Sequence, residues 1–136
     1  TPAAGFVDAG AAFFIGITPP LICYFFVSFV KSRLGYDDSL ADFACHGMGG
    51  VWGALMTGIF CTKTINDAGA DGLLYGNPGQ LIPQMTGIVT GIIVAIVMTT
   101  LIIKVLGSFM KVRATASEEA QGLDLIDHGE RAYNKL

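Results

Sequence analysis

Three long apolar stretches, almost free of charge, constrain this chain more than any other feature of its sequence. They cover residues 9–30, 43–61 and 81–106, and most charged side chains lie between them or after them. A helix of about 20 apolar residues crosses the hydrocarbon core of a bilayer. Backbone polar groups inside lipid must bond to one another, so each stretch is predicted to be helical. The sequence therefore predicts an all-α integral membrane protein with three transmembrane helices.

The composition agrees with a membrane protein. Hydrophobic residues make up 52% of the chain, charged residues make up 14%, and the mean hydropathy is +0.59. Ordinary soluble domains carry about 25% charged residues. The net charge of −3 and the pI near 5.1 argue against nucleic acid as a partner.

Charge also predicts how the chain is organised and oriented. We expect a transmembrane region over residues 1–113, with the first helix interrupted at Thr18-Pro19-Pro20, and a polar tail over residues 114–136. The loop between the second and third stretches has only Lys63 as a basic residue. Basic residues favour the cytoplasmic side, which predicts a multi-pass protein of the cell membrane with a cytoplasmic tail. The basic residues that follow the first and third stretches are Lys31, Arg33, Lys111 and Arg113.

The start of the chain and its cysteines carry two further expectations. The chain begins with Thr1-Pro2 and has no initiating methionine, so we expect an internal fragment of a longer protein. Cys23, Cys45 and Cys61 lie inside apolar stretches without a C-x-x-C spacing. They are interpreted as packing thiols, and neither a metal site nor a cofactor is predicted.

His46 is the most informative single residue. Apart from the two thiols, it is the only ionisable group in the stretch 43–61, FACHGMGGVWGALMTGIFC. Placing such a group at the centre of a bilayer costs roughly 2.5 kcal/mol or more, so an intramembrane histidine indicates a functional site. Its ordinary pKa is near physiological pH, so it can accept and release protons. The alternative is that His46 only makes a hydrogen bond to a neighbouring helix.

Helical periodicity predicts what surrounds His46. Residues three or four apart share a helix face. Small residues on such a face permit the close approach of another helix or leave space for a lumen. We therefore predict that His46 faces protein or a pore, with Phe43 and Gly50 on the same face, and that Asp42 caps the helix or orients its entry. The complete predicted face carries Asp42, Phe43, Gly49, Gly50, Gly53 and Thr57, and the opposite face carries Met48, Val51, Trp52, Leu55 and Ile59.

Three motifs in the chain resemble one family. FACHGMGGVWGALMTGIF, preceded by Asp37-Asp38-Ser39, resembles the pore-lining segment of the ammonium transporter (Amt/Mep/Rh) family. The opening TPAAGFVDAGAAFFIG resembles the segment that leads into the family's ninth helix. The ending GLDLIDHGERAY resembles the family's cytoplasmic tail signature. The chain thus resembles the C-terminal portion of such a transporter, helices nine to eleven of an eleven-helix fold followed by the tail.

The resemblance implies a function and a site. Members of the family are homotrimers, and each protomer has a hydrophobic pore lined by two histidines, one from each half of an inverted repeat. His46 matches the second histidine, and the first lies in the half that this chain lacks. Ammonium is thought to lose its proton near this pair, and the sequence leaves open whether net ammonium or neutral ammonia crosses.

The resemblance also assigns a regulatory role to the tail. The matching positions are expected to dock under the membrane on a neighbouring protomer and, in prokaryotes, to lie near a PII-type signalling protein. The chain departs from the family at Ala41, where many members have an acidic residue, and at Ile126, where plant members have a phosphorylatable threonine. For His128 the alternative is an exposed hydrogen-bonding residue. The matching tail positions are Gly122, Asp124, His128, Gly129 and Tyr133.

Two other classes of function remain as alternatives. A membrane metalloenzyme that uses His46 as a ligand or base needs further ligands in the spans, and the three stretches contain no glutamate, aspartate or second histidine. A membrane-embedded sensor or a non-transporting fragment is the other alternative. The sequence favours a channel or transporter, not an enzyme, with ammonium or ammonia and the lipid bilayer as its partners.

Overall fold

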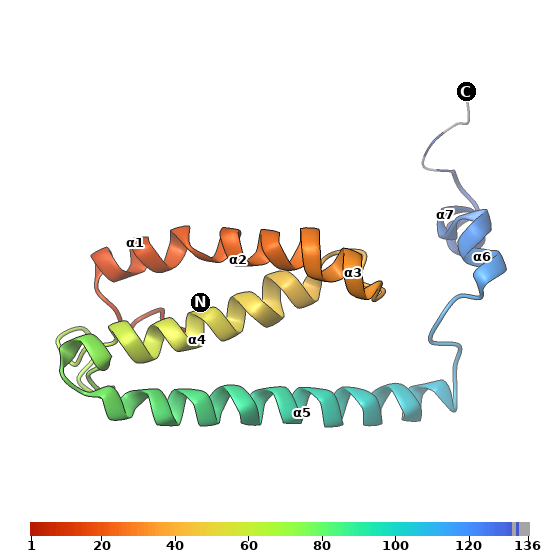
Figure 1. The fold of residues 1–136 in the computed structure, drawn as a ribbon. Helices are drawn as coiled ribbons and strands as arrows, with labels where there is room; N and C mark the ends of the chain where they lie inside the picture. The colour runs from red at the N-terminus through yellow and green to blue at the C-terminus, as the bar shows by residue number, and fades with distance from the viewer. Residues whose placement is uncertain (132, 134–136) are drawn as a thin grey trace. The chain divides into compact units, whose positions relative to one another are not determined.

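The computed structural model describes residues 1–131 and 133, and all regular secondary structure in these residues is helical (Figure 1). The chain divides into two compact units, Thr1–Ile92 and Ile93–Leu136. The first unit contains His46 and everything packed around it. The second contains the tail.

The first apolar stretch is helical but not uniform. It comprises α1 (Ala9–Ile17), α2 (Pro19–Phe25), the π-helix η1 (Phe26–Lys31) and α3 (Ser32–Leu34). The predicted interruption at Thr18-Pro19-Pro20 is confirmed, because α1 ends and α2 begins there.

The Thr18 hydroxyl makes hydrogen bonds at this interruption. Proline has no N–H, so carbonyl groups one turn earlier lose their donors. The Thr18 hydroxyl lies 3.5 Å from the carbonyl oxygen of Ile15, four residues before Pro19, and 3.1 Å from that of Phe14, which also accepts the Thr18 N–H. The same hydroxyl accepts a 2.8 Å hydrogen bond from the indole Nε1 of Trp52. The kink is therefore tied to the helix that carries His46.

The second apolar stretch forms the π-helix η2 (Phe43–Met48), which continues directly into α4 (Gly49–Phe60). It packs on α1 and α2, and a small core of Ala3, Ile15 and Met56 is buried there. The apolar side chains around this core are Val7, Trp52, Leu55, Ile59 and Phe60.

The connection after α4 is ordered by hydrogen bonds to distant parts of the chain. It contains two 3₁₀ helices, η3 (Leu73–Tyr75) and η4 (Pro78–Gln80). The Thr62 N–H donates to the Phe6 carbonyl oxygen at 2.9 Å, and the Tyr75 hydroxyl donates to Asp8 Oδ2 at 2.8 Å. The pKa of Asp8 lies below its usual value. The main cause is the hydrogen bond that its carboxylate accepts from the Ala11 N–H, and the second is the one from the Tyr75 hydroxyl. The loop is thus fastened to the beginning of α1.

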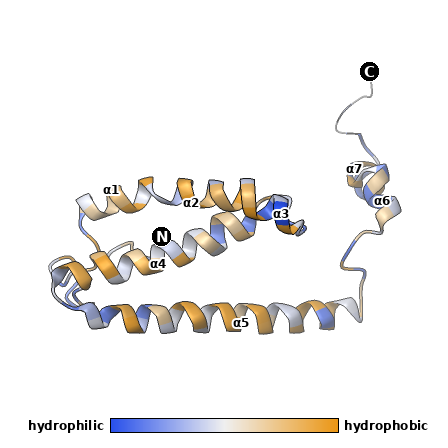
Figure 2. Ribbon diagram, in the orientation of Figure 1, coloured by the Kyte–Doolittle hydropathy of each residue, from blue (hydrophilic) through white to orange (hydrophobic). Residues whose placement is uncertain are grey.

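The third apolar stretch forms one long helix, α5 (Leu81–Gly107), and none of its residues, all of which the structure describes, is buried. Two helical stretches of the described chain, Ala9–Leu34 and Pro78–Gly107, are long and apolar enough to cross a membrane. In Figure 2 much of the ribbon of α1, α2 and α5 is orange, the colour of hydrophobic residues. In the most apolar 18-residue segment of each stretch, the buried share is 6% for Ala9–Leu34 and 0% for Pro78–Gly107. The core helix of a soluble protein is, in contrast, mostly buried.

The helix that carries His46 is not among these two stretches. It is the shortest of the three predicted spans, and glycine, tryptophan and the histidine itself lower its hydropathy. The count of three transmembrane helices therefore stays a prediction.

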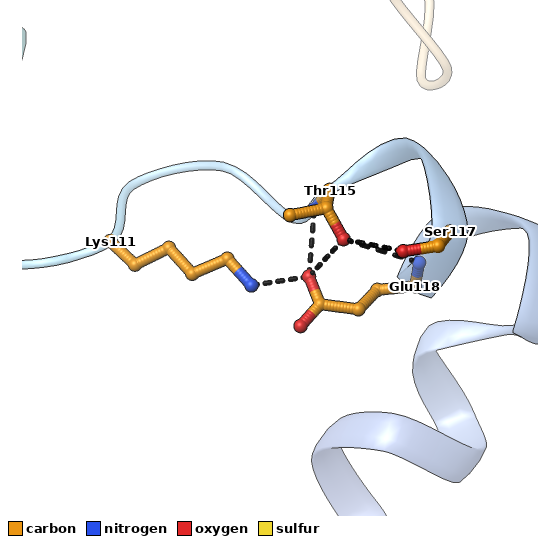
Figure 3. Close-up of polar contacts among 4 residues, drawn as sticks. All are labelled: Lys111, Thr115, Ser117 and Glu118. Carbon is orange, nitrogen blue, oxygen red and sulfur yellow. Dashed lines mark hydrogen bonds and ion pairs between the residues drawn. The ribbon is translucent and has the colours of Figure 1, made fainter.

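In the second unit, the tail contains two short helices, α6 (Ala116–Gln121) and α7 (Leu123–His128). Figure 3 shows the capping box that begins α6. Thr115 Oγ1 accepts from the Glu118 N–H at 3.4 Å, and Glu118 Oε2 accepts from the Thr115 N–H at 2.7 Å. Lys111 Nζ donates to the same carboxylate oxygen. This reciprocal arrangement satisfies backbone donors that a helix start leaves unpaired.

We expect the capping box to weaken only in strong acid. The hydrogen bond from Lys111, followed by those from Thr115, lowers the pKa of Glu118 from 4.5 to about 2. A carboxyl whose pKa is lower in the folded than in the unfolded chain stabilises the folded state at any pH above its unfolded-state pKa. This contribution is lost as the pH falls through the pKa of the folded state. An NMR titration of the Glu118 carboxyl carbon measures the pKa directly. Glu119→Gln should leave it low, Lys111→Ala should raise it, and an unshifted pKa in the unmodified chain would contradict the assignment.

Candidate functional site

His46 lies in a π-helical turn and not in a regular α-helix. The Gly49 N–H reaches back to the carbonyl oxygen of Ala44, five residues earlier, which is the π-helical spacing. Short π-helical segments inside helices are rare and occur frequently at functional sites. Nothing in the sequence signals this turn.

The side chain of His46 is largely uncovered by its own chain. Its exposed fraction is 85%, and that of its nearest charged neighbour, Asp42, is 68%. His46 Nε2 lies 4.0 Å from Asp42 Oδ1. An ion pair this long between exposed groups contributes little stability. The imidazole is therefore positioned by the helix backbone and not by this pair.

Asp38, not Asp42, caps the helix. Asp38 Oδ1 accepts from the Asp42 N–H at 2.8 Å, and Oδ2 accepts from the Phe43 N–H at 3.1 Å. Asp42 stands at the N-terminal boundary as predicted, but among the described residues its carboxylate makes no capping hydrogen bond. The Asp38 carbonyl oxygen accepts from Lys31 Nζ, which ties the cap to η1. Asp38, which is also a capping residue type, therefore makes the capping hydrogen bonds expected of Asp42, and a role of Asp42 in orienting the helix entry stays a prediction.

The turn between the cap and the helix places Ala41 at a positive φ of 58°. The left-handed conformation costs a residue with a Cβ atom roughly 1–2 kcal/mol. The carboxylate of Asp38 offsets this cost because it satisfies two of the first backbone donors of the helix.

Replacing Asp38 by alanine should loosen the entry of the His46 helix. Loss of a capping side chain typically costs about 1 kcal/mol, within a range of about 0.5–2 kcal/mol. Hydrogen exchange at the amides of Asp42 and Phe43, together with the thermal midpoint, measures the effect. Asp42→Ala is the matched control, and a loss of stability in the control that equals or exceeds that of Asp38→Ala would contradict the cap.

Phe43 joins the two π-helical turns. Its ring centroid lies 6.1 Å from that of Phe26 in η1 and 5.7 Å from that of Tyr36, with nearly perpendicular ring planes. Edge-to-face contacts of this kind are favourable for aromatic rings. Phe43 therefore has a packing role in this chain, and about half of it, 49%, remains exposed.

Gly50 lines a groove between the helix of His46 and the first half of α5. The groove has a volume of about 270 Å³. Gly87 and Gly91 line it from α5, and a Cβ atom added at any of these three glycines meets no described atom within 4 Å. The full lining is Gly47, Gly50, Val51, Ala54, Gln84, Gly87, Ile88, Gly91 and Ile92.

The single small-residue face predicted around His46 is divided in the structure. Gly49 and Gly53 line a different pocket, together with the N-terminal segment and α1, whereas Gly50 faces α5. A Cβ atom on Gly53 would lie 2.9 Å from Pro2 Cδ, so this glycine permits close packing of the N-terminal segment. The structure therefore brings Asp42 close to His46 but places Phe43 and Gly50 against other partners.

The predicted tail residues lie in α7 and its flanks. Gly122, at φ 100°, precedes α7, and Gly129, at φ 68°, ends it in the left-handed region that favours glycine. The Asp124 carbonyl oxygen accepts from the Gly129 N–H, and His128 stands in the last turn, where a cation favourably meets the helix dipole. Tyr133 is exposed. Their docking role stays a prediction.

The described residues contain no group of three histidine, cysteine, aspartate or glutamate side chains close enough to hold a metal ion. The uncovered imidazole of His46, on a mostly apolar helix, stays the candidate functional group of the first unit.

Comparison with known proteins places these features in a family. A model of the Ammonium Transporter Family matches residues 1–133. An ammonium transporter of Bacillus subtilis is 45% identical over 133 residues, which cover 98% of this chain and 33% of that protein. One from Aquifex aeolicus is 42% identical, with 98% and 31% covered, and the ammonium transporter Amt1 of Archaeoglobus fulgidus is 38% identical, with 98% and 33% covered.

The chain spans about a third of the length of these relatives, which are transporters and not enzymes. The motifs around His46, at the start of the chain and in the tail lie within the matched region, and the resemblance that they carry is confirmed. This chain belongs to the ammonium transporter family.

Proposed function

We propose that the protein containing this chain transports ammonium or ammonia across the cell membrane through a pore to which His46 contributes. The observation that carries the proposal is the 85% exposed imidazole on a helix whose other side chains are almost all apolar. A polar group of this kind needs a partner or a lumen, and the rest of a longer protein can supply either. The family match gives the substrate class.

The chemistry follows from the properties of an imidazole in an apolar pore. A dry lumen disfavours a cation, so an ammonium ion that enters is driven toward the neutral form. His46 would accept or relay the proton as a general base, together with the second histidine that the family resemblance implies. Phe43 and Gly50 would contribute to the walls of the pore, and Asp42 to the entry of its helix.

The proposal extends to assembly and orientation. We infer that the protein is a homotrimer in which this part of each protomer forms three transmembrane helices and a cytoplasmic tail. We also infer that a PII-type signalling protein is a partner at the cytoplasmic face. Lys31, Arg33, Lys111 and Arg113 support this orientation, because basic residues favour the cytoplasmic side. The docking residues would be Gly122, Asp124, His128, Gly129 and Tyr133.

Uptake by cells tests the proposed function. The full-length protein is expressed in cells that lack their own ammonium transporters, and growth on low ammonium and accumulation of labelled methylammonium are measured. We expect both to be restored. A protein that reaches the membrane but restores neither would contradict transport and favour a sensor.

A further inference from the structure

Two thiols lie on packed helices beside the candidate pore residue. Cys23 lies on α2, and Cys45 lies in η2, directly before His46. They are 22 positions apart in the sequence, and the helices that carry them, α2 and η2, pack against each other. The sequence alone gives no reason to pair them, since they lack the spacing of a thiol motif.

A second observation places the sulfur of Cys23 on the same helix face as Cys45. A Cβ atom built on Gly49, four residues after Cys45, lies 3.6 Å from Cys23 Sγ. Residues four apart are neighbours on a helix surface, so Cys23 lies over the surface that Cys45 and Gly49 share. Cys45 is exposed and Cys23 is half-buried, whereas Cys61 is buried at the other end of α4.

We propose that Cys23 and Cys45 form a dithiol site for one soft, thiophilic centre that takes two sulfur ligands, such as divalent mercury or a trivalent arsenical. Sulfur ligands select soft ions. Zinc normally needs four protein ligands in a structural site, and the described residues offer no cluster of three. The pair therefore suits a centre that is satisfied by two thiolates.

The charge balance favours the same class of ligand. Two thiols and one mercuric ion give a neutral S–Hg–S bridge and release two protons. Two thiols and phenylarsine oxide give a neutral dithioarsenite, with loss of one water molecule and no change in oxidation state. Neutral products fit an apolar helix surface, where an unpaired charge is costly.

Bridging would link α2 to the turn that carries His46. Cys45 is adjacent to His46, so a covalent link from Cys45 to α2 would restrict the movement of this turn. The site would thus make the candidate pore segment sensitive to soft, thiophilic reagents.

Phenylarsine oxide tests the site in the full-length protein in native membranes. After treatment and a wash with excess monothiol, intact-protein mass spectrometry counts the arsenic adducts that remain, because chelation by two thiols resists exchange with a monothiol. We expect Cys23→Ser and Cys45→Ser each to retain one adduct fewer than the wild type. We expect dimercaptopropanol, a dithiol, to remove the adduct.

The matched control is Cys61→Ser, which should retain as many adducts as the wild type. Alanine variants at positions 23 and 45 repeat the test if a serine variant does not accumulate. An equal number of retained adducts in the wild type and in either single variant would overturn the proposal. The readout does not involve uptake, so it is independent of whether the protein transports ammonium.

Discussion

Replacing His46 by alanine should reduce the uptake of ammonium or methylammonium by about 100-fold or more. General acid–base catalysis by a positioned side chain typically contributes a factor of about 10²–10⁴. The imidazole is exposed and its long contact with Asp42 contributes little, so its removal should not unfold the helix. Initial rates of uptake by cells that express equal amounts of the full-length protein measure the effect.

Met48→Ala is the matched control for this prediction. Met48 lies two residues further along the same π-helix, on the face predicted to lie opposite His46. We expect the control to transport normally and both variants to assemble like the wild type. Normal uptake by His46→Ala would remove His46 from the proposed pore.

Replacing Gly72 by alanine should clearly destabilise the first unit. A Cβ atom at position 72 would lie 2.7 Å from the carbonyl oxygens of Gly58 and Ile59 and 2.9 Å from the Ile59 carbonyl carbon. These are backbone atoms at the end of α4, so they cannot move aside by a change of rotamer. Overpacking of this kind costs about 1–3 kcal/mol. The thermal midpoint of the purified full-length protein measures the loss.

Gly87→Ala is the control for the change at Gly72. A Cβ atom at Gly87 meets no described atom within 4 Å, and alanine is the better helix former. We expect an unchanged or slightly raised midpoint. An equal fall in both variants would show that the close approach at Gly72 does not determine stability.

Hydrophobicity and proline chemistry predicted the main elements of the fold from the sequence. The three apolar stretches are helical, and the first is interrupted at its two prolines, because both effects depend on local residue properties. The π-helical turns were not predicted. Phe26 of η1 and Phe43 of η2 are in ring contact, but hydrophobic periodicity does not indicate where a turn takes up an extra residue.

The candidate site was predicted less completely than the fold. The free-energy cost of placing an ionisable side chain in a bilayer was enough to single out His46. Helical periodicity placed Gly49, Gly50 and Gly53 on one face, whereas in the structure they line two different pockets. The cap was assigned to Asp42 because that residue adjoins the helix. Asp38 reaches the start of the helix across a left-handed turn at Ala41, a backbone conformation that residue type does not reveal.

The π-helical turn at η2 also sets the rotational phase of the helix that follows it. Each residue of an α-helix advances the direction of its side chain by about 100°. If residues 43–48 adopted α-helical geometry with no residue removed, every side chain of α4 would turn by about that angle relative to the capped entry. Trp52 would then point away from Thr18, and Gly53 from Pro2, although no residue in α4 had changed. The π-helical spacing of this segment therefore keeps Trp52 and Gly53 in phase with the capped entry of the helix.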